Sequence, residues 1–471
     1  MSEPEGSKTV KSWPDSGQTT EWVPTTIKYD DKVPTSYRWG YQIEDEVDRH
    51  EWFKLGLNSG DPLTGLALRY PSRTALPAVT GAEAERLTTD YLRRLKKYGE
   101  QYISEKIGEA FIKKTSLYHC STSGLIITEP EAAGIYALKT MKLSLKQNST
   151  FVMCDAGGGT VDLVSYTVAE LGRIPLIYEA APGSGGLCGS TFLNRSFDDY
   201  LRRKFIHYNA WDDGYHQDAM HKFEVWIKKE FNGDPHKSFF VRARGLPSDT
   251  SLNISNGQLE IKGRALQRIF EPVISEVVSL VQSQIQVTHT TVSAVLLTGG
   301  FGMSKYLKKR IEEGIGSIKV IPIEDGETAV VRGALMRAMA IVSPKLATLR
   351  IATRKARRSY GTLAYTTYNP TKHDESRKED DHFTGGSRVQ VMSWFVRKGE
   401  AVDESKPATF QFYWDQKVSE GHPGVIEMGI YACDDKKNKE APMYADDEGT
   451  YIPDRSSVPT EDGENSLIDQ I

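Results

Sequence analysis

The segment from residue 151 to residue 168 constrains the fold more than any other part of the chain. A short apolar run ends at Asp155, and three glycines follow at positions 157 to 159. Thr160 comes next, and a second run opens with Asp162. Short apolar runs bounded by glycine are typical of buried strands, and the Val, Leu, Thr and Tyr residues of the second run are typical of strands too. The segment therefore predicts a strand, a tight glycine turn and a second strand.

A turn of this composition has the chemistry of a phosphate site. Glycines lack side chains, so consecutive backbone N–H groups can converge on an anion. Asp155, at the end of the first strand, can hold Mg²⁺ through water, and the Thr160 hydroxyl can donate to a phosphate oxygen. Three glycines alone would usually form an ordinary β-turn, but the flanking acids and the threonine favour a phosphate site. The pattern differs from GxxxxGK[ST] and GxGxxG, because these glycines join two strands.

Residues 155–162 resemble the second phosphate motif of the actin-like ATPase superfamily. Within it, the resemblance is closest to the 70-kilodalton heat-shock chaperones, especially their divergent fungal relatives. Three further segments match this family in its own order. Residues 127–133 resemble the first connecting helix, residues 295–304 the adenosine motif and residues 329–334 the second connecting helix.

The resemblance implies an α/β chain with the two-lobed actin-like ATPase (ribonuclease H-like) fold, which binds ATP or ADP with Mg²⁺ between its lobes. It implies three catalytic candidates. Asp155 would orient the hydration shell of the Mg²⁺ ion, and Glu129 would act at the same ion through water. Lys54 matches by position the family's lysine that reaches toward the γ-phosphate, and a solvated surface lysine is its alternative.

The resemblance implies further residues as nucleotide contacts. Grouped by the part of the nucleotide they would meet, they are Gly157, Gly158, Gly159 and Thr160 at one phosphate, Gly185 and Gly186 at a second phosphate contact, and Gly299, Gly300 and Ser304 at the adenosine. The second contact is expected because a glycine loop that opens a helix presents N–H groups and a positive dipole end to an anion. Met303 stands where the family usually has an arginine, so a cation stack on the ring is expected to be lost. Lys228 and Lys229 are weaker adenosine candidates, because the spacing from the preceding acid departs from the family's.

The first lobe is expected to be truncated. Residues 15–20 resemble the family's first phosphate motif, but Pro14 precedes the acid where a buried strand should end, so we do not assign them to it. Measured against the family, the first two strands with their phosphate loop are missing, as are a strand and a helix before Glu129. A shortened gene model and a degenerate paralogue both explain this pattern. Short strands are expected at residues 8–13 and 23–29.

The resemblance implies two lobes, and the change of character after about residue 345 and the polar tail divide the rest, so four parts are expected. They are residues 1–150, the incomplete first lobe; residues 151–345, the second lobe and the returning connecting helix; residues 346–443, a smaller β-rich C-terminal region; and residues 444–471, a disordered acidic tail. Alternating residues at 388–396 and 408–414 predict strands in the third part. This part distantly resembles the peptide-holding domain of the chaperones.

Charge and cysteine usage narrow the functional classes. The net charge of −4 gives no general attraction to nucleic acid, and no apolar run is long enough for a membrane span. The four cysteines are far apart and form no CxxC pair, so a reducing compartment is expected. The polar, acidic first residues are wrong for a secretory signal, so a cytoplasmic location is expected.

We therefore expect a chaperone-like ATP-binding protein with weak or lost hydrolysis, and with unfolded peptides or co-chaperones as its partners. Losing even one preorganised donor typically costs roughly 10²–10³ in rate, and losing a whole phosphate loop should cost more. The alternative is a nucleotide-independent interaction or scaffold protein derived from the same fold. A sugar or small-molecule kinase is disfavoured by the chaperone-like connecting segments and the lack of a recognisable sugar-site motif.

Overall fold

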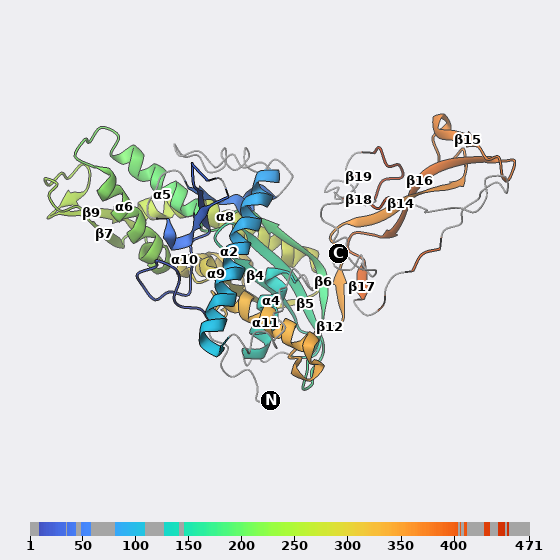
Figure 1. The fold of residues 1–471 in the computed structure, drawn as a ribbon, viewed down its shortest axis with the longest axis horizontal. Helices are drawn as coiled ribbons and strands as arrows, with labels where there is room; N and C mark the ends of the chain where they lie inside the picture. The colour runs from blue at the N-terminus through green and yellow to red at the C-terminus, as the bar shows by residue number, and fades with distance from the viewer. Residues whose placement is uncertain are drawn as a thin grey trace.

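A computed structural model describes most of the chain. The described residues are 9–33, 35–43, 49–57, 81–108, 127–140, 146–403, 406, 409–411, 428–433, 441–447 and 450–451. Figure 1 shows a main body around one mixed sheet, with a second, separate sheet formed by β14, β15, β16, β18 and β19.

A six-stranded sheet in the order β11-β10-β4-β5-β6-β12 organises the main body. Its strands are β4 (Thr150–Ala156), β5 (Val161–Glu170), β6 (Leu176–Gly186), β10 (Val292–Thr298), β11 (Lys319–Pro322) and β12 (Arg350–Ile351). β4 and β5 pair antiparallel, with Asp155 opposite Asp162. This hairpin confirms the predicted strand, glycine turn and strand. β10 runs parallel to β4, so both strands end at the same edge of the sheet.

Helices cover both faces of this sheet. α4 and α11 cover one face, and α5, α8 and α10 cover the other. Their bounds are α4 (Glu129–Thr140), α5 (Thr191–Lys204), α8 (Gly263–Val287), α10 (Lys305–Ile315) and α11 (Ala329–Val342), with the short turn η4 (Pro344–Leu346) after α11. Successive β4 residues contact opposite layers, since Phe151 and Met153 belong to the α4 side and Val152 and Cys154 to the α5 side. Burial on both faces explains the unbroken apolar run of β4.

α4 and α11 pack at very short distance. A Cβ atom built on Gly333 would lie 1.7 Å from the carbonyl oxygen of Ala132, so a residue with a side chain cannot take this position without a shift of the helices. These helices begin at the two segments that resemble the connecting helices of the family, and they lie side by side.

A small three-stranded sheet, in the order β7-β9-β8, extends the α5 side of the main body. Its elements and the helices before it are α6 (Asp213–Lys222), the π turn η3 (Phe223–Ile227), α7 (Lys228–Glu230), β7 (Ser238–Arg242), β8 (Ile254–Ser255) and β9 (Gln258–Lys262).

The first part of the chain contributes a small sheet and one long helix in its described residues. They are β1 (Thr26–Tyr29), β2 (Tyr37–Trp39), η1 (Gly40–Gln42), β3 (His50–Glu51), η2 (Phe53–Leu57) and α2 (Gly81–Ile107). Ile27, Trp39 and Phe53 pack against α2 in a separate apolar core. The strand predicted at residues 8–13 is wrong for residues 9–13, which pair with no strand; the Trp13 indole N–H donates to the carbonyl of Thr20 instead.

The C-terminal region is rich in strands, as expected. A five-stranded sheet has the order β15-β16-β14-β18-β19, and a separate pair joins β13 to β17. The elements are β13 (Thr353–Lys355), β14 (Ser359–Thr367), η5 (Glu375–Arg377), β15 (Lys378–Asp380), β16 (Ser387–Val396), β17 (Ala401–Asp403), β18 (Tyr431–Cys433) and β19 (Thr450–Tyr451). β16 confirms the strand predicted at 388–396. In the segment 408–414, residues 409–411 form no strand, and the others lie outside the described residues.

Part of the expected acidic tail packs against this sheet. β19 pairs with β18, and the Trp394 indole N–H donates to the carbonyl of Pro442, just before the expected start of the tail. The remainder of the tail, residues 452–471, lies outside the described residues.

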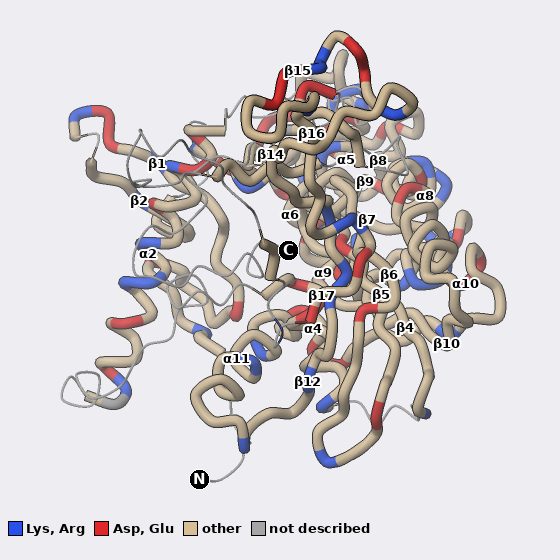
Figure 2. Tube along the Cα trace, turned by 90° about the vertical axis from the view of Figure 1, so that its right-hand side faces the viewer, with Lys and Arg blue, Asp and Glu red and all other residues tan. Residues whose placement is uncertain are grey.

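Charges of both signs are interspersed along the described chain, from β15 to α10 (Figure 2), in line with the small net charge. Among the described helices, none combines the length and the apolar character needed to cross a membrane.

Candidate functional site

The glycine turn between β4 and β5 lies on the start of α5. The turn is closed by the Gly157 N–H, which donates to the Thr160 carbonyl at 3.0 Å. The carbonyls of the three glycines accept hydrogen bonds from the residues that open α5. These bonds run from Ser190 to Gly157 (3.1 Å), from Thr191 to Gly158 (2.9 Å) and from Gly189 to Gly159 (3.2 Å).

These carbonyl contacts fix the direction of the turn's N–H groups. In a trans peptide unit the C=O and the N–H point in opposite directions. The carbonyls of residues 157–159 face α5, so the N–H groups of residues 158–160 face away from it. Within the described chain, none of these three N–H groups donates a hydrogen bond to protein. Three successive unused donors on a partly exposed turn form a concavity suited to an anion.

Gly299 borders this turn at the end of β10. Thr298 lies opposite Asp155 in the parallel ladder, and Gly299 has a φ of +81°, which glycine adopts readily. A Cβ atom on Gly299 would lie 2.3 Å from the Ala156 carbonyl oxygen and 2.6 Å from Oδ1 of Asp155. Bare backbone at this position therefore lies directly against the Asp155 carboxylate. Gly300 is exposed, with no atom within 4 Å of its Cβ position, so space is open on that side of the short helix α9 (Gly299–Gly302).

The first part of the chain brings a charge pair to the same place. Leu55 of η2 is buried, and its Cδ2 would lie 3.2 Å from a Cβ on Gly159. This contact places the neighbouring Lys54 near the turn, where its Nζ donates to Oε1 of Glu129 at 2.6 Å. Glu129 is the first residue of α4. The three predicted catalytic residues, Asp155, Glu129 and Lys54, therefore lie close enough for the charges of Glu129 and Lys54 to shift the pKa of Asp155.

The carboxylates of this cluster disfavour one another's charge. Burial, followed by the charges of Glu129 and Asp162, raises the pKa of Asp155 to about 7, and Lys54 partly opposes this. The pKa of Asp162 is also raised, first by burial, while the Thr160 hydroxyl and Lys54 lower it. Strongly shifted carboxylates at the edge of a sheet are a signature of functional sites.

This donor set fits a hydrated Mg²⁺ ion. Three carboxylates outnumber the one ammonium group, so a divalent cation would relieve their repulsion, and oxygen ligands are those that Mg²⁺ prefers. In the described residues, no group of three His, Cys, Asp or Glu side chains is arranged as direct metal ligands.

Gly185 and Gly186 lie inside strand β6, not in the loop that opens α5. They pair with Asp162 and Val161 of β5, and a Cβ on Gly185 would lie 2.6 Å from Oδ1 of Asp162. The loop before α5 is residues 187–190, and its N–H groups at 189 and 190 already bind the glycine turn. The position inferred for these two glycines is therefore wrong, because the glycine-rich segment continues the strand.

The predicted adenosine residues lie on α9, at the start of α10 and on α7. Ser304 is buried and caps α10, since its hydroxyl accepts the N–H of Leu307. Lys228 is buried and paired with Glu224 at 2.7 Å, and Lys229 is paired with Glu327 at 2.9 Å. The π turn η3 precedes Lys228, and such a turn accommodates an extra residue, which accounts for the unusual acid-to-base spacing.

Asp162 also belongs to the candidate site, although the sequence analysis did not select it as a site residue. The closed turn at residues 157–160 sets the register that places it opposite Asp155. The sequence signal that could have identified Asp162 is the pair of acids, one at each end of a short turn between two strands.

Comparisons with known proteins identify distant relatives. A family model described as "Domain of unknown function (DUF8568)" matches residues 354–455. The chain is 21% identical over 262 residues to human Heat shock 70 kDa protein 12B, across 49% of this chain and 36% of that protein. It is 22% identical over 261 residues to Heat shock 70 kDa protein 12A of human and of mouse, with the same coverage. The matched segment thus spans about a third of the relatives' length.

These similarities support a distant relationship to the 70-kilodalton heat-shock proteins. The mixed α/β architecture, with helices on both faces of the central sheet, is consistent with an actin-like fold.

Proposed function

We propose that this chain binds Mg·ATP or Mg·ADP at the β4–β5 turn, as a divergent protein of the 70-kilodalton heat-shock type. The observation that carries the proposal is the set of three unused N–H groups at residues 158–160 beside the buried Asp155. Gly158, Gly159 and Thr160 would donate to phosphate oxygens. The ring of the nucleoside would lie against the open backbone at Gly299 and Gly300.

In this proposal Asp155 and Glu129 would bind the water shell of Mg²⁺, and Asp162, opposite Asp155, would add negative charge. The ion, when bound, supplies neutralisation of the phosphate charge. Lys54 would exchange its contact with Glu129 for one with a terminal phosphate. The ion pair of Lys54 with Glu129, and the effect of both residues on the pKa of Asp155, support these roles.

We propose further that hydrolysis is weak or absent, with the first lobe truncated. Phosphoryl transfer depends on positioning and charge stabilisation from both sides of the phosphates. The described residues before α4 form three short strands, two short helical turns and α2. Of the residues before the turn near Asp15, 9–13 are described and form no strand, and the Asp15 carboxylate accepts from Gln42. Both facts support a missing first phosphate loop.

A chaperone role for the β-rich region after residue 346 is part of the same proposal, with unfolded peptides or co-chaperones as partners and a cytoplasmic location. It rests on similarity to the heat-shock relatives.

Calorimetric titration of the full chain with Mg·ATP and Mg·ADP tests nucleotide binding. We expect both to bind, and Asp155→Ala to weaken both. Asp218→Ala, which removes an exposed acid on α6, is the matched control and should bind like the wild type. A folded wild type that binds neither nucleotide would contradict the proposal and favour the nucleotide-independent scaffold function. A phosphate-release assay then tests the chemistry, and turnover at the level of an intact chaperone would refute impaired hydrolysis.

A further inference from the structure

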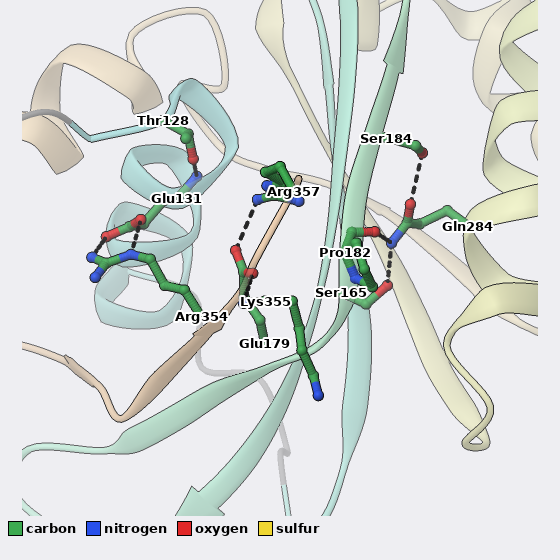
Figure 3. Close-up of polar contacts among 10 residues, drawn as sticks. All are labelled: Thr128, Glu131, Ser165, Glu179, Pro182, Ser184, Gln284, Arg354, Lys355 and Arg357. Atoms are coloured by element: carbon green, nitrogen blue, oxygen red, sulfur yellow. Dashed lines mark hydrogen bonds and ion pairs between the residues drawn. The ribbon is translucent and has the colours of Figure 1, made fainter. Parts of the chain in front are cut away.

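The first turn of α4 is held by a residue from the C-terminal region. Thr128 caps the helix, and the Glu131 N–H donates to its hydroxyl oxygen at 3.4 Å. A glutamate at this spacing usually reaches back to the backbone N–H of the capping residue. Here its carboxylate is instead bound by Arg354, at 2.8 Å from Nη2 and 3.2 Å from Nε (Figure 3).

This ion pair is buried and has two parallel hydrogen bonds. The Glu131 side chain is 3% exposed and that of Arg354 is 20% exposed. Two-point contacts between arginine and a carboxylate fix orientation as well as distance. Removing one partner would leave a buried charge uncompensated, which is strongly unfavourable. The geometry of the first turn of α4 therefore depends on Arg354, which belongs to β13 and is the first residue of the matched domain of unknown function.

A second arginine of the same segment binds a different element. Arg357 pairs with the buried Glu179 of β6 at 2.9 Å, and the backbone N–H of Lys355 donates to the same carboxylate at 2.6 Å. The Arg357 guanidinium crosses Gly183 so closely that a Cβ there would lie 2.1 Å from its Nη1. Residues 354–357 thus bind both α4 and β6.

The two contacts differ in their relation to the candidate site. Glu131 shares the first turn of α4 with Glu129, which pairs with Lys54 and raises the pKa of Asp155. A helical turn moves as a unit, so a shift of Glu131 displaces Glu129. Glu179 lies on β6, outside that turn.

We propose that Arg354 is a positioning residue for the nucleotide site: it fixes the first turn of α4 and thereby holds Glu129 in place for the hydrated Mg²⁺ of a bound nucleotide. The inference rests on the proposed function. In this proposal, the first residues of the C-terminal region contribute to the geometry of the nucleotide site.

The test compares two affinities in the full chain, the Kd for Mg·ADP and the Kd for ADP in excess EDTA. We expect Arg354→Ala to weaken Mg·ADP about tenfold or more, as for residues that orient metal-binding groups, and to leave the Kd for metal-free ADP unchanged. Arg354→Lys keeps the charge but loses the two-point contact, so it should fall in between. Glu131→Gln keeps the side-chain volume and serves as the second variant if Arg354→Ala does not fold, with the same expected loss.

Arg377→Ala is the matched control, because it removes another two-point contact between an arginine and a carboxylate, the one with Asp446 within the C-terminal region. It should leave the ratio of the two Kd values as in the wild type. Equal weakening of both affinities by Arg354→Ala, or the same change of ratio in Arg377→Ala, would overturn the inference and leave Arg354 a purely structural residue. A folded wild type that binds neither form of ADP would remove the proposed function and this inference together, a result distinct from the other two.

Discussion

Burial of the Asp155 carboxylate is energetically unfavourable for its charged form. The residue is 5% exposed, and its carboxylate lies against the backbone of Gly299 and has two further carboxylates near it. A purely structural position would be satisfied by an apolar side chain. The retained charge makes sense if a cation and phosphates complete the site, because a neutralising ligand would offset the repulsion.

The pKa of Asp155 gives a test at this scale. Its folded-state pKa of about 7 lies above the ordinary value of 3.8, so the folded protein binds this proton more tightly than the unfolded chain does. The contribution of Asp155 to the free energy of unfolding therefore decreases as the pH rises from about 4 to about 7, and the ionised group is destabilising above that window. Asp155→Asn removes the charge, so without nucleotide it should be more stable than the wild type at pH 8, by roughly 4 kcal/mol.

Urea denaturation of both proteins at pH 4.5 and pH 8 measures this difference. The two should be nearly equal in stability at the lower pH. A difference that does not change with pH would contradict the shifted pKa of Asp155.

Among the elements, α4 and α11 depend on one glycine for their packing. Gly333→Ala would place a methyl group 1.7 Å from the Ala132 carbonyl oxygen, and the helices would have to separate. We expect the free energy of unfolding to fall by about 2–4 kcal/mol.

Gly99→Ala is the control for this substitution, because Gly99 lies inside α2 with no atom within 4 Å of its Cβ position. Alanine there should stabilise the protein by up to about 1 kcal/mol, through helix propensity. Chemical denaturation of the two variants and of the wild type measures both changes in the free energy of unfolding. If Gly333→Ala is as stable as the wild type, the close approach of the two helices is incorrect.

The sequence predicted elements best where one pattern determines one structure. The apolar run before Asp155 and the glycines after it left little choice but a hairpin, and the structure has it. Gly185 and Gly186 were misplaced because glycine fits both a loop and a strand beside a close neighbour, and only the pairing of β6 with β5 distinguishes them. The acid-to-base spacing before Lys228 could not be matched to the family's spacing, because the π turn η3 changes the helical period locally.

Motifs and position along the chain predicted Asp155, Glu129 and Lys54 as members of the candidate site. The contact that links this site to the C-terminal region could not be predicted. The contact of Glu131 with Arg354 joins residues 223 positions apart, and no local pattern encodes such a pair. Thr128 and Glu131 have the capping-box spacing, but the competing arginine becomes visible only in three dimensions.

At the scale of the molecule, residues 350–357 join the two regions through side chains as well as through the chain itself. β12 extends the central sheet, and Arg354 and Arg357 then bind the buried acids of α4 and β6. A boundary drawn at residue 345 by composition would separate these partners. The ion pairs of the buried Glu131 and Glu179 therefore cross that boundary.

The central claim is that the β4–β5 turn binds nucleotide phosphate, and a crystal structure of the full chain with Mg·ADP tests it most directly. We predict phosphate oxygens within hydrogen-bonding distance of the N–H groups of Gly158, Gly159 and Thr160, with Mg²⁺ reached through water from Asp155. Nucleotide bound elsewhere, with these three N–H groups facing solvent, would contradict the account.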